Sequence, residues 1–529
     1  MISGAKNSFN KSFVKVSNFD KAFLPLIFCC VFYIIKAINF PVHDFANYYF
    51  GGKFLANDIF TSDIYFPYEF NKAIYNLGYP EIFASYAPNT PFLAVLFLPI
   101  SYMPIEIAKV AFNFISTILF IISIYKLFCF YKIDFKCVIL IPILFFIPIK
   151  NNLLFGQVYF LLFFLLVEFW LAYEKNKKLN SAIFLSLAIL LKVFPILFIF
   201  IFFFKKQYKF LFYTIGICFL FFGISCFFTG IDIWIFFIQS VLPKASSGEI
   251  ATAFVNNYQS VFMFFKELLV FDAIENPSSF FNNPILFSGL IAGFKIALIA
   301  IGFYVCKNVT QPIIIFSYCI LFSILISPYG STYTFILLIF VFLALLKTEI
   351  SCFKKVVYLV LIFLINNLPT SIFINYSFPF SYLRLLFLIT FFILFISFFY
   401  QYINWKIISI LFLLTIVTAA LFKKNEIPTT DYLLNKNAPI LIFDYKIENN
   451  SLTYFYWNIK GENEQIFPFK FKTIYYLKIK DNQVFYKNKQ VTFDNSNKLK
   501  AVLINNKTII YLSDLDRGIG FYTIRSMKI

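Results

Sequence analysis

The chain has 529 residues, of which 60% are hydrophobic and only 13% are charged, and its mean hydropathy is +0.80. Soluble globular chains are about half apolar and about a quarter charged. The composition therefore excludes an ordinary soluble enzyme, a disordered chain and a disulfide scaffold. The apolar runs are about 18 residues or longer and do not alternate as short strands do, which indicates a helical, polytopic membrane protein.

The net charge is +19, from 45 Lys and Arg against 26 Asp and Glu. A basic balance is also typical of nucleic-acid-binding proteins. In a chain this apolar, however, lysine clusters set the orientation of membrane helices, because cytoplasmic loops carry the positive charge. We therefore expect no nucleic acid among the partners. The excess of Lys, Ile, Asn and Phe is typical of an AT-rich bacterial genome.

The nine cysteines lie in apolar runs or at their edges and show no CxxC spacing, which supports neither a disulfide framework nor a zinc site. The first 21 residues are polar and contain several lysines, so we expect residues 1–21 to be cytoplasmic. The apolar run that follows, 22–40, has no small-residue cleavage site and predicts a retained membrane helix. Segment 41–90, which is acidic, then lies outside.

Keeping the lysine clusters inside predicts about 13 membrane spans. The stretch 91–103 contains three prolines and is short for a span, so we expect it to lie at the outer face. The predicted spans are 22–40, 105–127, 137–149, 157–173, two halves of 181–204, 211–228, 285–305, 312–326, 333–346, 356–372, 383–403 and 405–422.

The stretch 181–204 has lysine clusters at both ends, and a single span would place one of them outside. Two short helices that meet at Lys192 and Pro195 keep both clusters inside, and proline disrupts a helix interior. We therefore predict a break there, with Lys192 at the outer side of the membrane.

The tail 423–529 is polar and rich in β-forming residues, and Asp481-Asn482 and Asn505-Asn506 are typical of hairpin turns. An odd number of spans places this tail outside. The predicted architecture is an all-α membrane domain over 22–422 followed by a small β-rich extracytoplasmic domain.

His43 and Asp44 stand just beyond the first span and are followed one helical turn later by Tyr48 and Tyr49. A carboxylate at this place can accept a proton from a hydroxyl group, and aromatic rings suit stacking against a sugar. The same pattern also fits a helix-capping Asp with tyrosines at the membrane interface. His43, whose ordinary pKa lies near neutrality, is the alternative base.

Two cations are predicted near the outer face. Lys192 can neutralise a lipid phosphate as a point charge, or it can simply extend to the interface. Arg384 can hold a phosphate through two hydrogen bonds, or it can serve as a topological anchor. Polar elements on the same predicted face are Gly156-Gln157, Asn256 to Ser260 and Ser327-Pro328-Tyr329. Each alone is a weak indication of a site, and it is their position on one face that favours a functional site.

The order of these elements resembles the GT-C superfamily of integral-membrane glycosyltransferases, and most closely glycosyltransferase family 87. The resemblance covers about residues 22–345 and rests on the order and spacing of short motifs. These motifs read Asp44-Phe45-Ala46-Asn47-Tyr48-Tyr49, Tyr86-Ala87-Pro88-Asn89-Thr90-Pro91, Gly156-Gln157, Lys192-Val193-Phe194-Pro195 and Asn257-Tyr258-Gln259-Ser260. The tail 423–529 has no counterpart in the family pattern.

The resemblance implies a polyprenyl-phosphate sugar donor, often of mannose, an active site on the outer face of a bacterial inner membrane, and a lipid or glycan acceptor. Asp44 would be the base, the sugar would transfer with inversion, and no metal or other cofactor is expected, because the outer loops contain no DxD element and Asp514-Leu515-Asp516 in the tail is more typical of a turn. The expected donor- and substrate-binding residues are Tyr48, Tyr49, Tyr86, Gln157, Lys192, Asn257, Gln259 and, from its position alone, Arg384.

Two other classes share part of the pattern. A transporter or flippase of lipid-linked glycans has many spans and outer aromatic residues, but transporters often show internal repeats, which this sequence lacks. An interaction protein anchored by its membrane part would explain the β-rich tail, but not so many spans. The long acidic first loop favours the enzyme.

Overall fold

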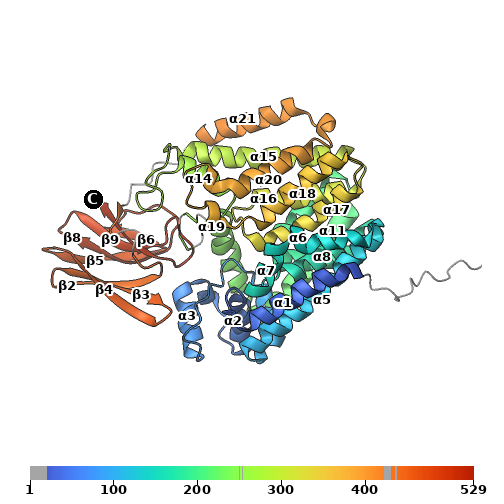
Figure 1. Cartoon of the computed structure of the whole chain (residues 1–529). Helices are drawn as coiled ribbons and strands as arrows, with labels where there is room; N and C mark the ends of the chain where they lie inside the picture. The colour runs from blue at the N-terminus through green and yellow to red at the C-terminus, as the bar shows by residue number, and fades with distance from the viewer. Residues whose placement is uncertain (1–20, 250, 253, 256, 422–430, 435–437) are drawn as a thin grey trace, which may run out of the picture.

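The computed structural model describes residues 21–249, 251–252, 254–255, 257–421, 431–434 and 438–529. These residues form a helical body with a β-rich domain at one of its ends (Figure 1). The expected mostly helical protein with a β-rich C-terminal region is therefore confirmed. The predicted cytoplasmic N-terminus, apart from Lys21, lies outside the described residues.

The helical body follows the chain in two halves. Proline at the first turn starts several of its helices, where a missing N–H costs nothing. The helices of the first half are α1 (Leu24–Ile38), α2 (Phe45–Ala56), α3 (Pro67–Asn76), α4 (Pro91–Phe97), α5 (Ile105–Tyr131), α6 (Leu140–Leu144), α7 (Phe146–Phe155), α8 (Tyr159–Glu174), α9 (Lys178–Leu191), α10 (Ile199–Phe204) and α11 (Tyr208–Thr229). Those of the second half are α12 (Ile231–Phe236), α13 (Leu242–Ser246), α14 (Val261–Leu269), α15 (Pro284–Asn308), α16 (Pro312–Ile326), α17 (Ile339–Lys347), α18 (Cys352–Asn367), α19 (Thr370–Phe373), α20 (Leu383–Ile396) and α21 (Trp405–Leu421).

Four helical segments in the described part of the chain are long and apolar enough to cross a membrane, namely Lys21–Ile38, Ile105–Tyr131, Tyr208–Thr229 and Pro284–Asn308. A bent pair of helices raises the number to five, and the remaining apolar helices are shorter. Helix length and composition thus support a membrane protein with four or five clear spans, fewer than the number expected from the charge pattern.

The predicted break at Lys192 is confirmed. Helix α9 ends at Leu191, and Lys192 takes an extended conformation with φ −145° and ψ 129°. A 3₁₀ turn over Phe194–Phe198, with Pro195 in its first turn, then leads into α10. The proline and the flanking lysines therefore divide this stretch into two short helices.

The span expected over 137–149 is not one straight helix. The structure places a 3₁₀ turn and α6 before Phe145 and α7 after it, and the two parts are bent by 68°. Pro148 explains the break, because it lacks the N–H that would bond to the carbonyl of Leu144. This bend directs the C-terminal end of α7 towards α2.

Segment 41–90, the expected first outer loop, contains the helices α2 and α3, which the sequence analysis did not anticipate. Helix α2 packs closely on α4. A Cβ atom on Gly52 would lie 2.7 Å from the backbone of Phe97, and one on Gly51 would meet the ring of Tyr86. The Gly-Gly pair is therefore required for this contact. Helix α4 is the short helix that the sequence predicted between 91 and 103.

The β-rich domain contains two antiparallel sheets. Their orders are β1-β10-β9-β8-β5-β6-β7 and β2-β3-β4, and apolar residues of both sheets share one core. The predicted hairpin turns are confirmed, because Asp481-Asn482 and Asn505-Asn506 join neighbouring strands with positive φ. The strands are β1 (Asp431–Tyr432), β2 (Ile442–Glu448), β3 (Ser451–Asn458), β4 (Gly461–Pro468), β5 (Ile474–Lys480), β6 (Gln483–Tyr486), β7 (Lys489–Gln490), β8 (Lys498–Ile504), β9 (Thr508–Ser513) and β10 (Thr523–Lys528).

The β-rich domain packs against the first outer loop (Figure 1). The ring of Tyr68, on α3, stacks on Phe443 at 4.0 Å, and its hydroxyl donates to the Glu462 carboxylate at 2.8 Å. Tyr75 meets Trp457 edge to face at 5.9 Å. These contacts require the tail and segment 41–90 to lie on the same side of any membrane that the helices cross.

Because segment 41–90 is expected on the outer face and the tail packs on it, we predict that the C-terminus lies outside. Alkaline phosphatase fused after Ile529 should be active, because it folds only outside, and green fluorescent protein fused there should be dark. The same reporters fused after Lys206, which is expected inside, should give the reverse pattern. A fluorescent and phosphatase-inactive fusion after Ile529 would contradict the predicted topology.

Candidate active site

Asp44 precedes the first residue of α2 but does not cap this helix. Its side chain accepts no hydrogen bond from the backbone of the first turn. The turn before it is held by Lys109, whose Nζ donates to the carbonyl of Pro41 at 2.9 Å. The helix-capping interpretation of Asp44 is therefore not supported, and the carboxylate is available for other contacts.

Gln157 holds the Asp44 carboxylate. Its Nε2 donates to Asp44 Oδ2 at 2.5 Å, and its Oε1 accepts a hydrogen bond from the Tyr48 hydroxyl at 2.7 Å. Gln157 and Tyr48 are buried, whereas the Asp44 side chain is 32% exposed. Two buried polar groups thus orient one carboxylate that solvent and a substrate can reach.

Gly156 brings Gln157 to this position. It ends α7 in the left-handed conformation, with φ +65°, which glycine adopts without strain. A Cβ atom there would lie 2.7 Å from Cβ of Phe45, the residue that follows Asp44. The Gly-Gln pair is therefore explained by the close approach of α7 to the start of α2.

His43 lies beside the carboxylate on its more exposed side. Its Nδ1 is 3.2 Å from Asp44 Oδ1, and its ring stacks on Phe155 with centroids 4.2 Å apart. Its backbone has φ +54°, an uncommon conformation for a residue other than glycine. The stacking fixes the imidazole next to Asp44.

Lys192 is held on the other side of Tyr48. Its Nζ donates to Asn89 Oδ1 at 3.0 Å and lies 5.7 Å from the centre of the Tyr48 ring. The negative charge of Asp44 interacts favourably with the ammonium group of Lys192. Asn89, in turn, donates from Nδ2 to the carbonyl of Tyr86. The Tyr-x-Pro-x-x-Pro element therefore positions Lys192, a role for Asn89 that the sequence analysis missed.

Aromatic rings border the same site. Burial raises the pKa of Tyr258 to about 12, and the nearby charge of Asp44 adds to the rise. Tyr258 meets Tyr329 edge to face at 5.6 Å, and Tyr159 packs on Tyr333 at 5.1 Å. Tyr258 and Tyr329 stand in predicted polar elements, but only the fold shows that Tyr258 lies near Asp44 and that Tyr329 packs on Tyr258.

Tyr49 and Tyr86 are turned towards the protein interior. The Tyr49 hydroxyl donates to the carbonyl of Met103 at 2.7 Å, and that of Tyr86 donates to Thr90 at 2.9 Å. Both residues are fully buried. Their contacts support the packing of α2 against the Tyr86 element and do not direct their hydroxyls towards the carboxylate.

The Asn-x-Gln-Ser element forms a neighbouring part of the wall. Gln259 is buried and donates from Nε2 to the carbonyl of Ser381 at 3.0 Å, while its Oε1 has no hydrogen-bond partner. Ser260 donates to the carbonyl of Pro328 at 2.7 Å. Asn257 is exposed. The element therefore joins the Ser327-Pro328 loop to the segment before α20.

Arg384 is separate from the pair formed by Asp44 and Lys192. It is 1% exposed, donates to the carbonyl of Leu368, and lies 6.0 Å from the Phe373 ring. Its Nε has no hydrogen-bond partner. None of its described contacts reaches Lys192. The structure thus brings together His43, Asp44, Tyr48, Gln157 and Lys192. Arg384 lies outside this group.

Within the described ranges, no group of three or more His, Cys, Asp or Glu side chains is arranged to hold a metal ion. The site that the structure assembles therefore consists of one oriented carboxylate, one imidazole, one ammonium group and a surrounding set of tyrosines. A carboxylate and a cation so placed suit the transfer of a group between a hydroxyl and a phosphate.

Comparison with known proteins agrees with this chemistry. Residues 87–328 match the family model of glycosyltransferase family 87. The resemblance inferred from the sequence motifs is therefore confirmed, and it supports a GT-C-type membrane protein. The family implies glycosyltransferase activity, with donor and acceptor substrates. No curated protein and no solved structure matches the chain.

Two glycines with positive φ, Gly156 beside Phe45 and Gly78 without close neighbours, provide a matched test. Gly156→Ala should lower glycosyltransferase turnover by about 10- to 100-fold, because the added Cβ displaces Phe45 and with it Asp44. Gly78→Ala, where φ is +90° and no atom lies within 4 Å, should keep turnover near that of the unchanged protein. Equal turnover of the two variants would contradict the proposed function of Gly156.

Both variants should lose thermal stability, because each places alanine in the left-handed region at a cost of about 1–2 kcal/mol. Gly156→Ala should lose more, because its Cβ also displaces Phe45. A melting measurement on the purified proteins checks this and separates misfolding from displacement of the carboxylate.

Proposed function

We propose that this protein transfers a hexose or pentose, with mannose favoured, from a polyprenyl-phosphate donor to a lipid or glycan acceptor. The observation that carries the proposal is the hydrogen bond from Gln157 to the carboxylate of Asp44, which does not cap its helix. Gln157 also bonds to Tyr48, and Lys192 lies beside the ring of Tyr48. This arrangement supports a base and a phosphate-binding cation within one site. The match to glycosyltransferase family 87 supports this class of reaction.

Asp44 is the general base of the proposed reaction. The acceptor hydroxyl gives its proton to the carboxylate while its oxygen attacks the anomeric carbon of the donor sugar. The bond from that carbon to the phosphate oxygen breaks, and its electron pair leaves with the polyprenyl phosphate. Attack from the face opposite the phosphate inverts the anomeric configuration.

Lys192 binds the donor phosphate. Its ammonium group is presented by Asn89 and by the end of α9, and it offsets the negative charge that grows on the leaving phosphate. The proposed step uses neither a metal nor another cofactor. Tyr48, Tyr258 and Tyr329 supply rings against which a sugar can pack.

The location proposed for this site is the outer face of a bacterial inner membrane. The charge pattern supports about 13 spans, with residues 1–21 inside. Residues 22–422 then form the catalytic membrane domain, whose first outer loop is 41–90, and residues 423–529 form the extracytoplasmic β-rich domain. The packing of Tyr68 and Tyr75 on this domain supports a common side.

Purified protein in lipid nanodiscs, incubated with a panel of polyprenyl-phosphate sugars, tests the proposed donor class. The expected result is release of polyprenyl phosphate from at least one donor, with polyprenyl-phosphate mannose tested first. Release from nucleotide sugars alone, or from no donor in the presence of mixed lipid acceptors, would reject the proposal.

Asp44→Asn should reduce turnover by about 10²- to 10⁴-fold, because the amide keeps the shape of the side chain and removes its basicity. Donor binding and melting temperature should change little. Steady-state turnover and donor titration on the same preparation measure both effects.

His43→Gln is the matched control for Asp44→Asn, since it replaces the imidazole that is the alternative base of the site. It should reduce turnover much less than Asp44→Asn does. A larger loss in His43→Gln would assign the base to the imidazole. Near-normal turnover of Asp44→Asn would exclude the proposed base and direct attention to Asp58, Asp63, Glu69 and Glu81 in the same loop.

Lys192→Met should weaken donor binding by about tenfold or more, because it removes a charge-assisted contact to phosphate. The affinity for the acceptor should change less. Arg384→Met is the comparison, since it removes a second buried cation whose contacts are with Leu368 and Phe373. Donor titration of both variants decides between them, and unchanged donor affinity in Lys192→Met would exclude Lys192 as the phosphate ligand.

A further inference from the structure

A pocket opens between the helical body and the β-rich domain. It encloses about 340 Å³ of space between protein atoms, part of which is open to solvent. Four segments that are distant in the sequence meet there. Its lining consists of Ser85, Ala87, Pro88, Val241, Lys244, Ala245, Glu249, Tyr329, Gly518, Ile519 and Phe521.

The pocket adjoins the candidate active site. The backbone N–H of Ser85 donates to Asn47, on α2 one turn after Asp44, at 2.9 Å. On the opposite wall, Tyr329 packs edge to face on Tyr258. Tyr258 lies close enough to Asp44 for the charge of that carboxylate to raise the pKa of the Tyr258 hydroxyl further. The pocket is therefore connected to the candidate active site through Asn47 on one wall and Tyr258 on the other.

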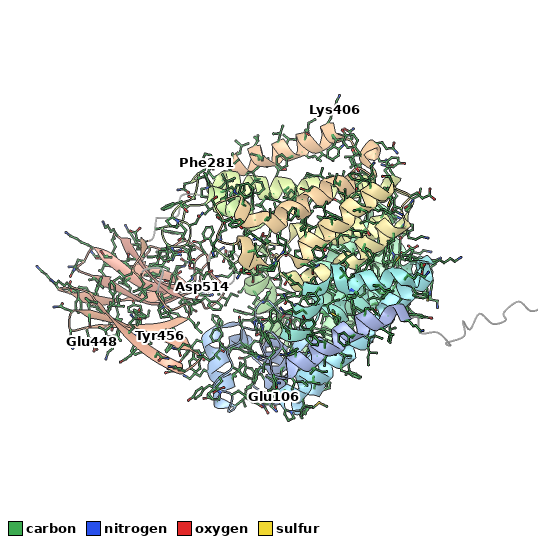
Figure 2. All side chains as sticks on the ribbon, viewed as in Figure 1. Glu106, Phe281, Lys406, Glu448, Tyr456 and Asp514 are labelled. Carbon is green, nitrogen blue, oxygen red and sulfur yellow. The ribbon has the colours of Figure 1, made fainter. Side chains whose placement is uncertain are left out.

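The wall that the β-rich domain contributes is rigidly built. Asp514 is fully buried and accepts hydrogen bonds from the backbone N–H of Gly520 at 3.0 Å and of Asn497 at 2.8 Å. Its Oδ1 also lies 2.9 Å from Nζ of Lys244, which belongs to the helical body. Figure 2 places Asp514 where the strands meet the helices. One carboxylate thus fixes the loop 514–521 and joins it to α13.

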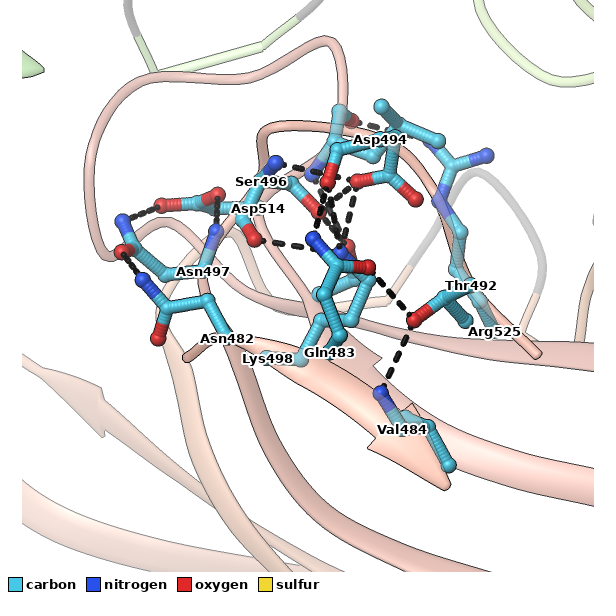
Figure 3. A network of polar contacts seen from close by, with 12 residues as sticks. Asn482, Gln483, Val484, Thr492, Asp494, Ser496, Asn497, Lys498, Asp514 and Arg525 are labelled. Carbon is cyan, nitrogen blue, oxygen red and sulfur yellow. Dashed lines mark hydrogen bonds and ion pairs between the residues drawn. The ribbon is translucent and has the colours of Figure 1, made fainter. Parts of the chain in front are cut away.

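A polar network supports this loop from within the domain (Figure 3). The buried Lys498 pairs with Asp494 at 2.8 Å, and Ser496 bonds to both Asp494 and Ser513. A buried charge left without its partner is strongly unfavourable, so such a network holds a single arrangement. These groups satisfy one another and do not form a second ligand site.

The chemistry of the pocket suits a carbohydrate. Tyr329 and Phe521 offer aromatic faces, and Glu249 offers a hydrogen-bonding carboxyl. The ammonium group of Lys244 is already engaged by Asp514 and by the carbonyl of Arg517. Glu249 Oε2 is 3.7 Å from Lys244 Nζ, so the carboxyl is only loosely engaged. Burial raises the pKa of Glu249 to about 7. Near neutral pH, this carboxyl is therefore able both to accept a hydrogen bond from a sugar hydroxyl and to donate one.

We propose that this pocket binds a sugar residue of the acceptor, and that the C-terminal β-rich domain completes the acceptor site through Gly518–Phe521. The proposal rests on the proposed function, since it assigns the second substrate of that reaction. It gives the tail a specific function, because the acceptor is held between two domains and presented to Asp44.

Photolabelling in lipid nanodiscs tests the proposal without turnover. In nanodiscs, no sugar-headed detergent competes with the probes. The probes are octyl α-mannoside, octyl β-glucoside and octyl β-galactoside carrying a diazirine, with diazirine-labelled octanol as the sugar-free control. The expected result is sugar-dependent labelling of peptides that contain residues 85–88, 241–249 or 518–521. Equal labelling by octanol, or labelling confined to other peptides, would overturn the proposal.

Glu249→Gln should reduce this labelling by about three- to tenfold, because it replaces a charge-assisted hydrogen bond by a neutral one. Ser85→Phe, which fills the pocket from a partly exposed position, should abolish it. Glu462→Gln is the matched control, since Glu462 bonds to Tyr68 at the same domain interface outside the pocket lining. It should leave labelling unchanged.

Undiminished labelling in both Glu249→Gln and Ser85→Phe would reject the pocket as the acceptor site, and melting curves confirm that each variant is folded. The outcome is independent of the donor assay. A protein that labels as expected but releases no polyprenyl phosphate would retain the sugar pocket and refute the proposed donor, so the two failures are distinguishable.

Discussion

The amide of Gln157 connects two helices that are more than 100 residues apart in sequence, and the candidate site depends on this contact. It donates to Asp44 and accepts from Tyr48, so the carboxylate and the ring beside Lys192 are fixed by one side chain. Hydrogen bonds to a charged group in an apolar surrounding are stronger than those in water. In a body this rich in phenylalanine, they determine where the only oriented carboxylate of the site points.

The backbone is adapted to that contact at several places. Gly156 gives α7 its close approach to Phe45, Gly52 gives α2 its approach to α4, and the break at Pro148 bends the segment that carries Gln157. The break before Pro195 does the same for Lys192. Gly156 and the two proline breaks interrupt regular helices close to Gln157 and Lys192, whereas Gly52 lies within α2 and permits its close packing on α4.

The sequence predicted those features that depend on local chemistry. Proline and flanking lysines located the break at Lys192, and paired Asn and Asp residues located the hairpins of the tail. Features that depend on long-range packing were not predictable. Asn89 as the partner of Lys192, the inward-facing hydroxyls of Tyr49 and Tyr86, and the Asp514 contact with Lys244 appear only once distant segments meet.

The central claim is that one site holds both the base and the donor phosphate. A cryo-EM structure of the protein in nanodiscs with a non-hydrolysable polyprenyl-phosphonate sugar tests it most directly. The account predicts a phosphonate oxygen within about 3 Å of Lys192 Nζ and the anomeric carbon facing the Asp44 carboxylate. A phosphonate bound beside Arg384, or on the face of the membrane opposite the β-rich domain, would contradict the account.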